Sequence, residues 1–224
     1  MITINKNSPP PELIQARKNI ANTEEPYESL DTDTKNAIRK SLCEEQEYLC
    51  AYCMGRIEPT KERMKIEHWL DRHTYKGDTQ LNYCILLGVC CGKTNYKNKQ
   101  HSHCDDSRGN SSLKFNPANP AHHSHLRITY SLKNGEISSE DKEFREQLNN
   151  VLNLNNQALL NNRLNVLKGV QDGLEKCAPN ATISRIQLQK FLDKYQDPNT
   201  KGKKEPYCGI AIWYIQKKLK LTSS

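Results

Sequence analysis

The feature that most constrains this chain is the crowding of cysteines into its first half. Of nine cysteines in 224 residues, five lie between Cys50 and Cys91, and a sixth follows at Cys104. The N-terminus lacks the apolar stretch of a signal peptide, and no apolar run approaches the roughly 18–20 residues that cross a bilayer. We therefore expect a soluble, cytoplasmic protein, in which thiols stay reduced and clustered cysteines indicate a metal site.

Cys50 and Cys53 form a CxxC knuckle, and two thiolates on such a tight turn can share one tetrahedral Zn²⁺. A closed structural site needs two further ligands. The candidates are Cys90 or Cys91, followed by Cys104 or His103. A redox-active CxxC would instead require a thioredoxin-like βαβ neighbourhood, which the sequence does not show. Cys84 is expected to be a small buried residue. The preferred zinc ligands are Cys50, Cys53, Cys90 and Cys104.

Charge and composition narrow the function classes without choosing one. The formal net charge of +7 suits a polyanionic partner such as nucleic acid. A solvated basic surface without such a partner accounts for the charge equally well. Hydrophobic residues make up only 35% of the chain, so we expect neither a large β-sandwich nor a doubly wound sheet.

Helices are expected before the cysteine-rich segment. Residues 1–9 show no periodic pattern and are predicted to be disordered. A short helix follows over residues 12–21. A second helix begins near Asp31 or Asp33, since either side chain can cap it, and it leads the chain to Cys50.

The region after the cysteine-rich segment is predicted to be a hairpin followed by helices. Asn134-Gly135 lies between two apolar segments, which is a strong hairpin signal. A helical pattern runs from about Asp141 to Cys177, and Ser184 can cap a further helix. A short apolar helix is expected over residues 210–215.

The segment between the two halves of the cysteine set contains a short alternating pattern at residues 64–69, which predicts a strand that carries Glu67 and His68. A lone histidine is more often structural than catalytic. Here, however, an apolar segment follows at residues 83–90 and leads into a cysteine. A second polar cluster then follows at residues 103–109.

This order of motifs resembles the HNH nuclease motif. More narrowly, it is similar to the HNH endonucleases of Septu and retron defence systems, the PtuB-like proteins, over roughly residues 40–130. The matching segments are Leu49-Cys50-Ala51-Tyr52-Cys53, Ile66-Glu67-His68, Leu86-Leu87-Gly88-Val89-Cys90 and His103-Cys104-Asp105.

The resemblance implies an α+β fold with a zinc-stabilised ββα-metal core. We expect an N-terminal helical segment over residues 1–42, the nuclease core over 43–118, and a hairpin with a mostly helical C-terminal region over 119–224. The last region is expected to serve packing or partner docking, because it fits the family only loosely.

The resemblance also implies roles for individual residues. His68 is the expected general base, and Glu67 and Asp105 are the expected ligands of one catalytic Mg²⁺ or Mn²⁺, which prefer hard oxygen donors. Arg108 falls where the motif often has lysine and is expected to contact a phosphate. Lys93 and Lys97 lie in a basic insert, which is either a loop along a nucleic-acid backbone or an ordinary exposed loop.

One position departs from the motif. The central asparagine, which orients the loop carrying the histidine, should stand five residues before the zinc cysteine, and Ile85 occupies that position. Asn82 could replace it only in a different local register. The departure leaves open which group aligns His68.

The leading hypothesis is a metal-dependent endonuclease, with DNA as the preferred substrate, that acts as the effector of an antiphage system. The resemblance implies a PtuA-like ATPase as partner and, in a retron, a reverse transcriptase with its multicopy single-stranded DNA. Two alternatives remain, a nuclease directed at a structured RNA such as tRNA and a zinc-knuckle binding or scaffold module that does not cleave. Four further histidines are expected to lie at the surface: His73, His122, His123 and His125.

Overall fold

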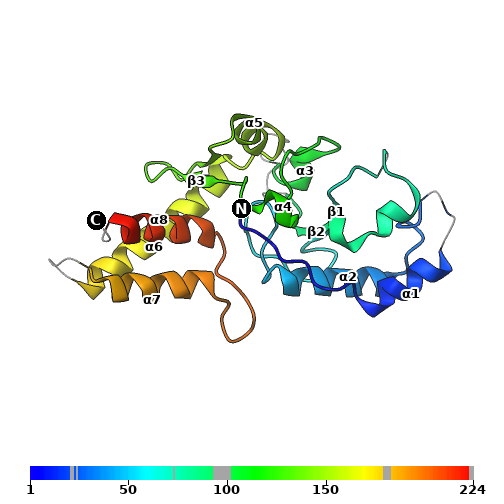
Figure 1. Cartoon of the computed structure of the whole chain (residues 1–224), viewed down its shortest axis with the longest axis horizontal. Helices are drawn as coiled ribbons and strands as arrows, with labels where there is room; N and C mark the ends of the chain where they lie inside the picture. Colours follow the sequence, from blue (N-terminus) through cyan, green and yellow to red (C-terminus); the bar gives the residue numbers. More distant parts are fainter. Residues whose placement is uncertain (21–22, 24, 73, 93–101, 179–182, 222–224) are drawn as a thin grey trace.

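The computed structural model describes residues 1–224 apart from 21–22, 24, 73, 93–101, 179–182 and 222–224. The fold is a mixture of helices with two small two-stranded sheets. In Figure 1 the molecule is elongated, with α1, α2, β1 and β2 toward one end and α6, α7 and α8 at the other. The elements of the first half are α1 (Pro11–Asn19), α2 (Thr32–Glu45), β1 (Lys65–His68), η1 (Gly77–Leu81), η2 (Tyr83–Ile85), β2 (Leu86–Val89) and α3 (Asp105–Arg108).

The second half begins with a short helix and a hairpin and continues as helices. Its elements are α4 (Pro120–His123), β3 (Ile128–Tyr130), β4 (Ile137–Ser139), α5 (Lys142–Glu146), the π-helical η4 (Gln147–Val151), α6 (Gln157–Cys177), α7 (Arg185–Gln196) and α8 (Cys208–Leu221). Among the described residues, no helix is long and apolar enough to span a membrane.

The first half is built on β1 and β2, which pair antiparallel with His68 opposite Leu86 and Lys65 opposite Val89. Helix α2 packs against both strands. The Asp31 side chain caps α2 by accepting a hydrogen bond from the Thr34 amide, as the sequence predicts, and Ile38 on its inner face is fully buried. β1 and the residues after it are therefore held on a helical support.

The prediction of disorder over residues 1–9 is wrong. The Ile4 amide donates to the Pro117 carbonyl at 2.8 Å, and the Ile4 side chain is buried. Lys6 forms a buried ion pair with Glu45 at the end of α2 and also donates to the Leu86 carbonyl at 2.9 Å. These contacts hold the segment against the core. Its sequence shows no hydrophobic periodicity from which they could be predicted.

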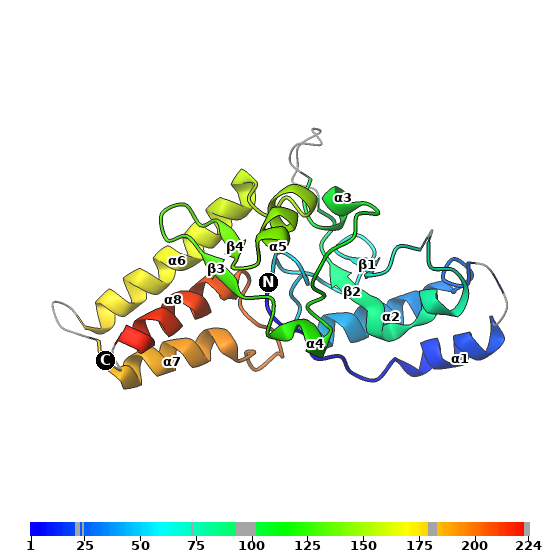
Figure 2. The ribbon, with the colours of Figure 1, turned by 45° about the horizontal axis from the view of Figure 1, so that its top comes forward.

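The C-terminal half confirms the predicted hairpin and helices. β3 and β4 pair antiparallel, and Gly135 in the connecting turn has φ +73°, a conformation that favours glycine. Ser184 caps α7 through a capping box with Gln187, and α7 packs along α8. In Figure 2 the helices α6, α7 and α8 lie together beyond the hairpin.

Backbone hydrogen bonds join the two halves. The Tyr207 amide donates to the Met54 carbonyl at 2.9 Å, and the Cys104 amide donates to the Leu152 carbonyl at 2.9 Å. The residue pairs in both bonds link the cysteine-rich segment to the C-terminal region. The helical half therefore packs directly against the cysteine-rich segment. The division of the chain into three domains stays a prediction.

Candidate metal centre and active-site cleft

Four cysteines lie together, and they are the set preferred from the sequence: Cys50, Cys53, Cys90 and Cys104. Their sulfur atoms all lie within 4.8 Å of one another. The Cys50 and Cys104 sulfurs are 3.8 Å apart, and the Cys53 and Cys90 sulfurs are 3.7 Å apart. Four thiolates about 2.3 Å from one tetrahedral Zn²⁺ would stand about 3.8 Å from each other. The cluster could thus bind a metal ion such as zinc.

Each cysteine reaches the cluster from the end of a short element. Cys50 and Cys53 belong to the turn closed by the isolated bridge between Leu49 and Arg56. Cys90 directly follows β2, and Cys104 directly precedes α3. The cluster therefore ties together the knuckle, the hairpin and the start of α3.

Two candidates that the sequence left open are placed beside the cluster. The Cys91 thiol turns away and donates to the Glu62 carbonyl at 3.3 Å. Nδ1 of His103 lies 3.1 Å from the Cys104 sulfur, within reach of a hydrogen bond to that ligand. The expectation that Cys84 is buried is wrong, because this residue is exposed.

The cluster is largely buried, although Cys90 is partly exposed. Cys50, Cys53 and Cys104 are each no more than 2% exposed. Hydrogen bonds from the neighbouring thiols lower the pKa of Cys53 well below its usual range, which favours a thiolate in the middle of the group. A buried site with four protein donors and no open position is typical of a structural metal centre.

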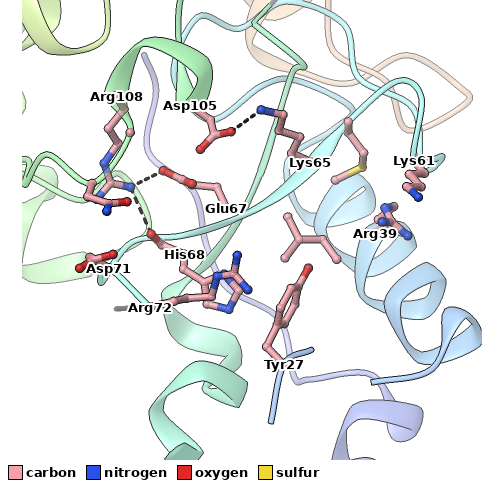
Figure 3. Close-up of a pocket in the computed structure, with 14 residues that line it drawn as sticks. Tyr27, Arg39, Lys61, Lys65, Glu67, His68, Asp71, Arg72, Asp105 and Arg108 are labelled. Carbon is pink, nitrogen blue, oxygen red and sulfur yellow. Dashed lines mark hydrogen bonds and ion pairs between the residues drawn. The ribbon is translucent and has the colours of Figure 1, made fainter. Parts of the chain in front are cut away.

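A cleft of about 500 Å³ opens next to the cluster, and it contains the three residues predicted to be catalytic. Glu67 and His68 come from β1, and Asp105 is the first residue of α3. Figure 3 shows Glu67 between Arg108 and Asp105, with His68 below it. The antiparallel hairpin and the helical turn after Cys104 thus bring together residues that are almost forty positions apart in the sequence.

Glu67 is buried and closely held. Its carboxylate forms an ion pair with Arg108 and accepts a hydrogen bond from the Tyr52 hydroxyl at 2.9 Å. Burial raises the pKa of Glu67 to about 7, and a hydrogen bond with Asp105 adds to this rise, while Arg108 opposes it. Two carboxyl groups in contact favour a shared proton or a bound cation.

Asp105 faces a lysine as well as Glu67. Nζ of Lys65 lies 2.8 Å from the Asp105 carboxylate and 2.8 Å from that of Asp106. Burial alone would raise the pKa of Asp105, but the hydrogen bonds from Glu67 and Lys65 outweigh it and lower this pKa. Asp105 therefore stays ionised beside the Glu67 carboxyl.

His68 is oriented by a main-chain group. Its Nε2 lies 2.9 Å from the Gln80 carbonyl oxygen. Because a carbonyl only accepts, Nε2 must carry the proton, and Nδ1 is left as the basic nitrogen. Burial lowers the pKa of His68 to about 4, so the ring is neutral at pH 7. The edge-on ring of Tyr27, with a centroid separation of 4.5 Å, covers one side of the imidazole.

Arg108 has a role that differs from the predicted phosphate contact. Its side chain is buried and donates to Glu67, to the Tyr52 hydroxyl at 3.1 Å, and to the His68 carbonyl at 3.2 Å. The guanidinium also donates to the carbonyls of Trp69 at 2.7 Å and Ser111 at 2.9 Å. With these donors engaged, Arg108 fastens α3 to the end of β1 and has little left for a ligand.

Ile85 and Asn82, the two positions considered for the motif asparagine, both make local contacts. The Ile85 carbonyl accepts from the Trp69 amide at 2.9 Å, so this residue extends the pairing of the two strands. Asn82 caps η2 by accepting from the Cys84 amide at 3.1 Å. Alignment of His68 falls instead to the Gln80 carbonyl, which sequence reasoning missed because every residue carries such a group.

Several other predicted positions can now be placed. Lys93, Lys97 and His73 lie outside the described residues. His122 accepts from the Asn116 amide at 2.9 Å, and His123 lies 2.9 Å from the Pro117 carbonyl. These histidines stabilise the turn at α4, and in the described part of the chain they form no metal-binding group.

The residues of the cleft wall that were not predicted from the sequence include Tyr27, Arg39, Lys61 and Arg72. They lie in loops and on α2, outside the motif segments, and no spacing rule connects them to the motif. A comparison with protein-family models finds no match, and a comparison with curated proteins finds none either.

Proposed function

We propose that this chain is a metal-dependent endonuclease of the HNH type, which hydrolyses phosphodiester bonds in DNA. Its ββα-metal core would consist of β1, β2 and α3, with a structural Zn²⁺ on the four clustered cysteines. The observation that carries the proposal is the meeting of Glu67, His68 and Asp105 in one cleft directly beside that cluster.

In this mechanism His68 acts as the general base. Nδ1 accepts a proton from the attacking water, while the hydrogen bond to Gln80 holds the ring in one tautomer. The neutral state of the ring at pH 7 is the state that can accept a proton. Tyr27 limits how far the imidazole can turn.

Glu67 and Asp105 would hold the catalytic Mg²⁺ or Mn²⁺. Two neighbouring carboxylates suit such a cation, because Mg²⁺ usually binds through one or two carboxylates and keeps water or phosphate oxygens on its other positions. When bound, the cation orients the scissile phosphate and stabilises the charge on the leaving oxygen. Arg108 positions Glu67 for this role, and Lys65 positions Asp105.

The decisive experiment compares nicking of supercoiled plasmid with Mg²⁺ or Mn²⁺ by wild type, His68→Ala and His123→Ala. Loss of a general base costs about 10²–10⁴-fold in rate, so His68→Ala should be nearly inactive. His123→Ala removes a histidine outside the cleft and should cleave like wild type. Equal rates for all three proteins would contradict the assignment of His68.

The same assay separates the two alternatives. Cleavage of tRNA but not plasmid would point to an RNA nuclease with the same residues. Nucleic-acid binding without cleavage would favour the scaffold module. The ion pair between Arg108 and Glu67 favours the scaffold module, because a guanidinium bound to the carboxylate competes with a metal cation.

We also propose, from the resemblance of the motifs, that the nuclease is the effector of an antiphage system with a PtuA-like ATPase. In a retron, the reverse transcriptase and its multicopy single-stranded DNA would join this complex. Co-expression with a PtuA-like ATPase tests this directly. A stable complex on gel filtration is expected, and two separate peaks would contradict the pairing.

A further inference from the structure

The cations that line the cleft fall into two groups. Three of them form ion pairs with carboxylates: Lys65 with Asp105, Arg72 with Glu28, and Arg108 with Glu67. The other two are Arg39 on α2 and Lys61 in the loop before β1. Within the part of the chain that the structure describes, neither of these two forms an ion pair. In the view of Figure 3 both lie at the edge of the cleft away from Arg108.

Arg39 shows a second unusual feature. Its Nε is a buried nitrogen without a hydrogen-bond partner, and no other buried side-chain nitrogen or oxygen among the described residues is left in this way. One terminal nitrogen of the guanidinium donates to the Asn36 side chain at 3.0 Å. A buried donor without a partner destabilises the folded chain. The Nε itself is closed to ligands, but Arg39 lines the cleft, where a phosphate oxygen can contact the guanidinium.

Lys61 complements this arginine. Its side chain is exposed and lines the same cleft, so it adds a mobile positive charge to a fixed guanidinium. An arginine fork together with a lysine point charge is a donor set that matches phosphate oxygens. A carboxylate of the protein would satisfy Arg39 as well, but Glu67 and Asp105 pair with Arg108 and Lys65, and Asp71 accepts hydrogen bonds from Thr74.

We propose that Arg39 and Lys61 form a phosphate subsite that binds the DNA backbone next to the scissile phosphodiester. This inference rests on the proposed function, since it assumes that the cleft receives DNA. The subsite positions the strand, while Glu67, His68 and Asp105 act on the bond. Arg72 does not take part, because it is paired with Glu28 and lies over the Tyr27 ring.

The test measures DNA binding in a His68→Ala background without added divalent cation, so that cleavage and metal binding do not interfere. The probe is a fluorescent single-stranded DNA oligonucleotide, followed by anisotropy at several salt concentrations. Arg39→Gln and Lys61→Gln are compared with Arg63→Gln. Arg63 is a matched control because it lies two residues from Lys61 but outside the cleft, and its side chain is 65% exposed.

We expect Arg39→Gln to raise Kd about tenfold, which corresponds to about 1.4 kcal/mol, because a charged hydrogen bond to the phosphate is lost. Lys61→Gln should raise Kd by a smaller factor, as exposed charges do. Each substitution should reduce the slope of log Kd against log salt by about 0.7–0.9, because one phosphate contact is lost. Arg63→Gln should leave both Kd and the slope within about twofold of the background protein.

Equal Kd values and salt slopes in all three variants would overturn the subsite. If the intact protein still cleaves DNA in that case, the proposed function survives and this inference alone fails. Absence of both binding and cleavage in wild type would overturn both. Because Lys61 is exposed, Lys61→Gln keeps the test valid even if Arg39→Gln disturbs α2.

Discussion

The cysteine cluster and the cleft lie side by side and are built on opposite principles. The cluster contains four identical donors, is largely buried, and has sulfur atoms within 4.8 Å of one another. The cleft contains unlike charges around a space of about 500 Å³. A closed donor set suits an ion that holds a fold together, whereas an open set leaves room for a ligand. Under the proposed function, the cluster maintains the fold and the cleft carries the chemistry.

The first prediction breaks the cluster and has the largest expected effect. Cys50→Ser should lose the bound zinc and unfold the first half, because metal binding supplies on the order of 10 kcal/mol to a small domain. Zinc content by mass spectrometry and far-UV circular dichroism measure this. Cys91→Ser, whose thiol lies outside the cluster, should keep about one zinc per chain. Equal zinc content in the two variants would refute the ligand set.

The second prediction breaks the cleft at its buried ion pair. Arg108→Met should reduce the free energy of unfolding by about 3–5 kcal/mol, because Glu67 is left buried without its counterion. Urea denaturation measures the change. Arg127→Met removes an exposed pair with Glu140 and should cost less than about 1 kcal/mol. Similar losses in the two variants would show that Arg108 is not what holds the cleft.

The third prediction uses pH to separate the two regions. Burial raises the pKa of Glu67 to about 7 from an ordinary 4.5, so between these values the folded chain binds more protons there than the unfolded chain. The free energy of unfolding should therefore fall as pH rises through this window, by up to about 3 kcal/mol. Melting without added divalent cation measures this. The fall should be absent in Glu67→Gln, and an unchanged slope would contradict the assignment.

The fourth prediction concerns a contact at the rim and has the smallest effect. Asp106→Asn removes one of the two carboxylates around Lys65, but the Asp105 contact remains. Because Lys65 is 40% exposed, the change in the free energy of unfolding should stay below about 1 kcal/mol. A melting temperature within a few degrees of wild type is expected. A larger loss would show that the rim, too, is part of the rigid scaffold.

The two regions differ in how far the sequence predicts them. Spacing narrows the metal ligands to a few cysteines and one histidine, and strand alternation places Glu67 and His68 on β1, because ligand sets and alternation leave a pattern in the chain. It cannot distinguish Cys90 from Cys91, since that choice depends on how the chain leaves β2. The role of Arg108 was missed for a related reason, because the motif shows its position but not its burial.

The remaining parts of the cleft have no local signal. Gln80 acts through its carbonyl, which any residue possesses, and Arg39 lies on α2, an element that belongs to no motif. Both reach the cleft through tertiary packing of α2 and η1 near β1. The helices of the C-terminal half were easier to predict, because capping residues such as Ser184 and apolar periodicity can be recognised within a short stretch of sequence.

Cys104 and Asp105 are joined by one peptide bond, so the fourth thiol of the cluster and a carboxylate of the cleft enter the chain together during synthesis. The ribosome adds Cys50, Cys53 and Cys90 first. Cys104 follows, together with Asp105, the carboxylate that contacts Glu67. A nascent chain that ends before Cys104 therefore has neither a complete metal centre nor a complete pair of acids. Under the proposed function, hydrolytic competence would arise only after translation has passed this point.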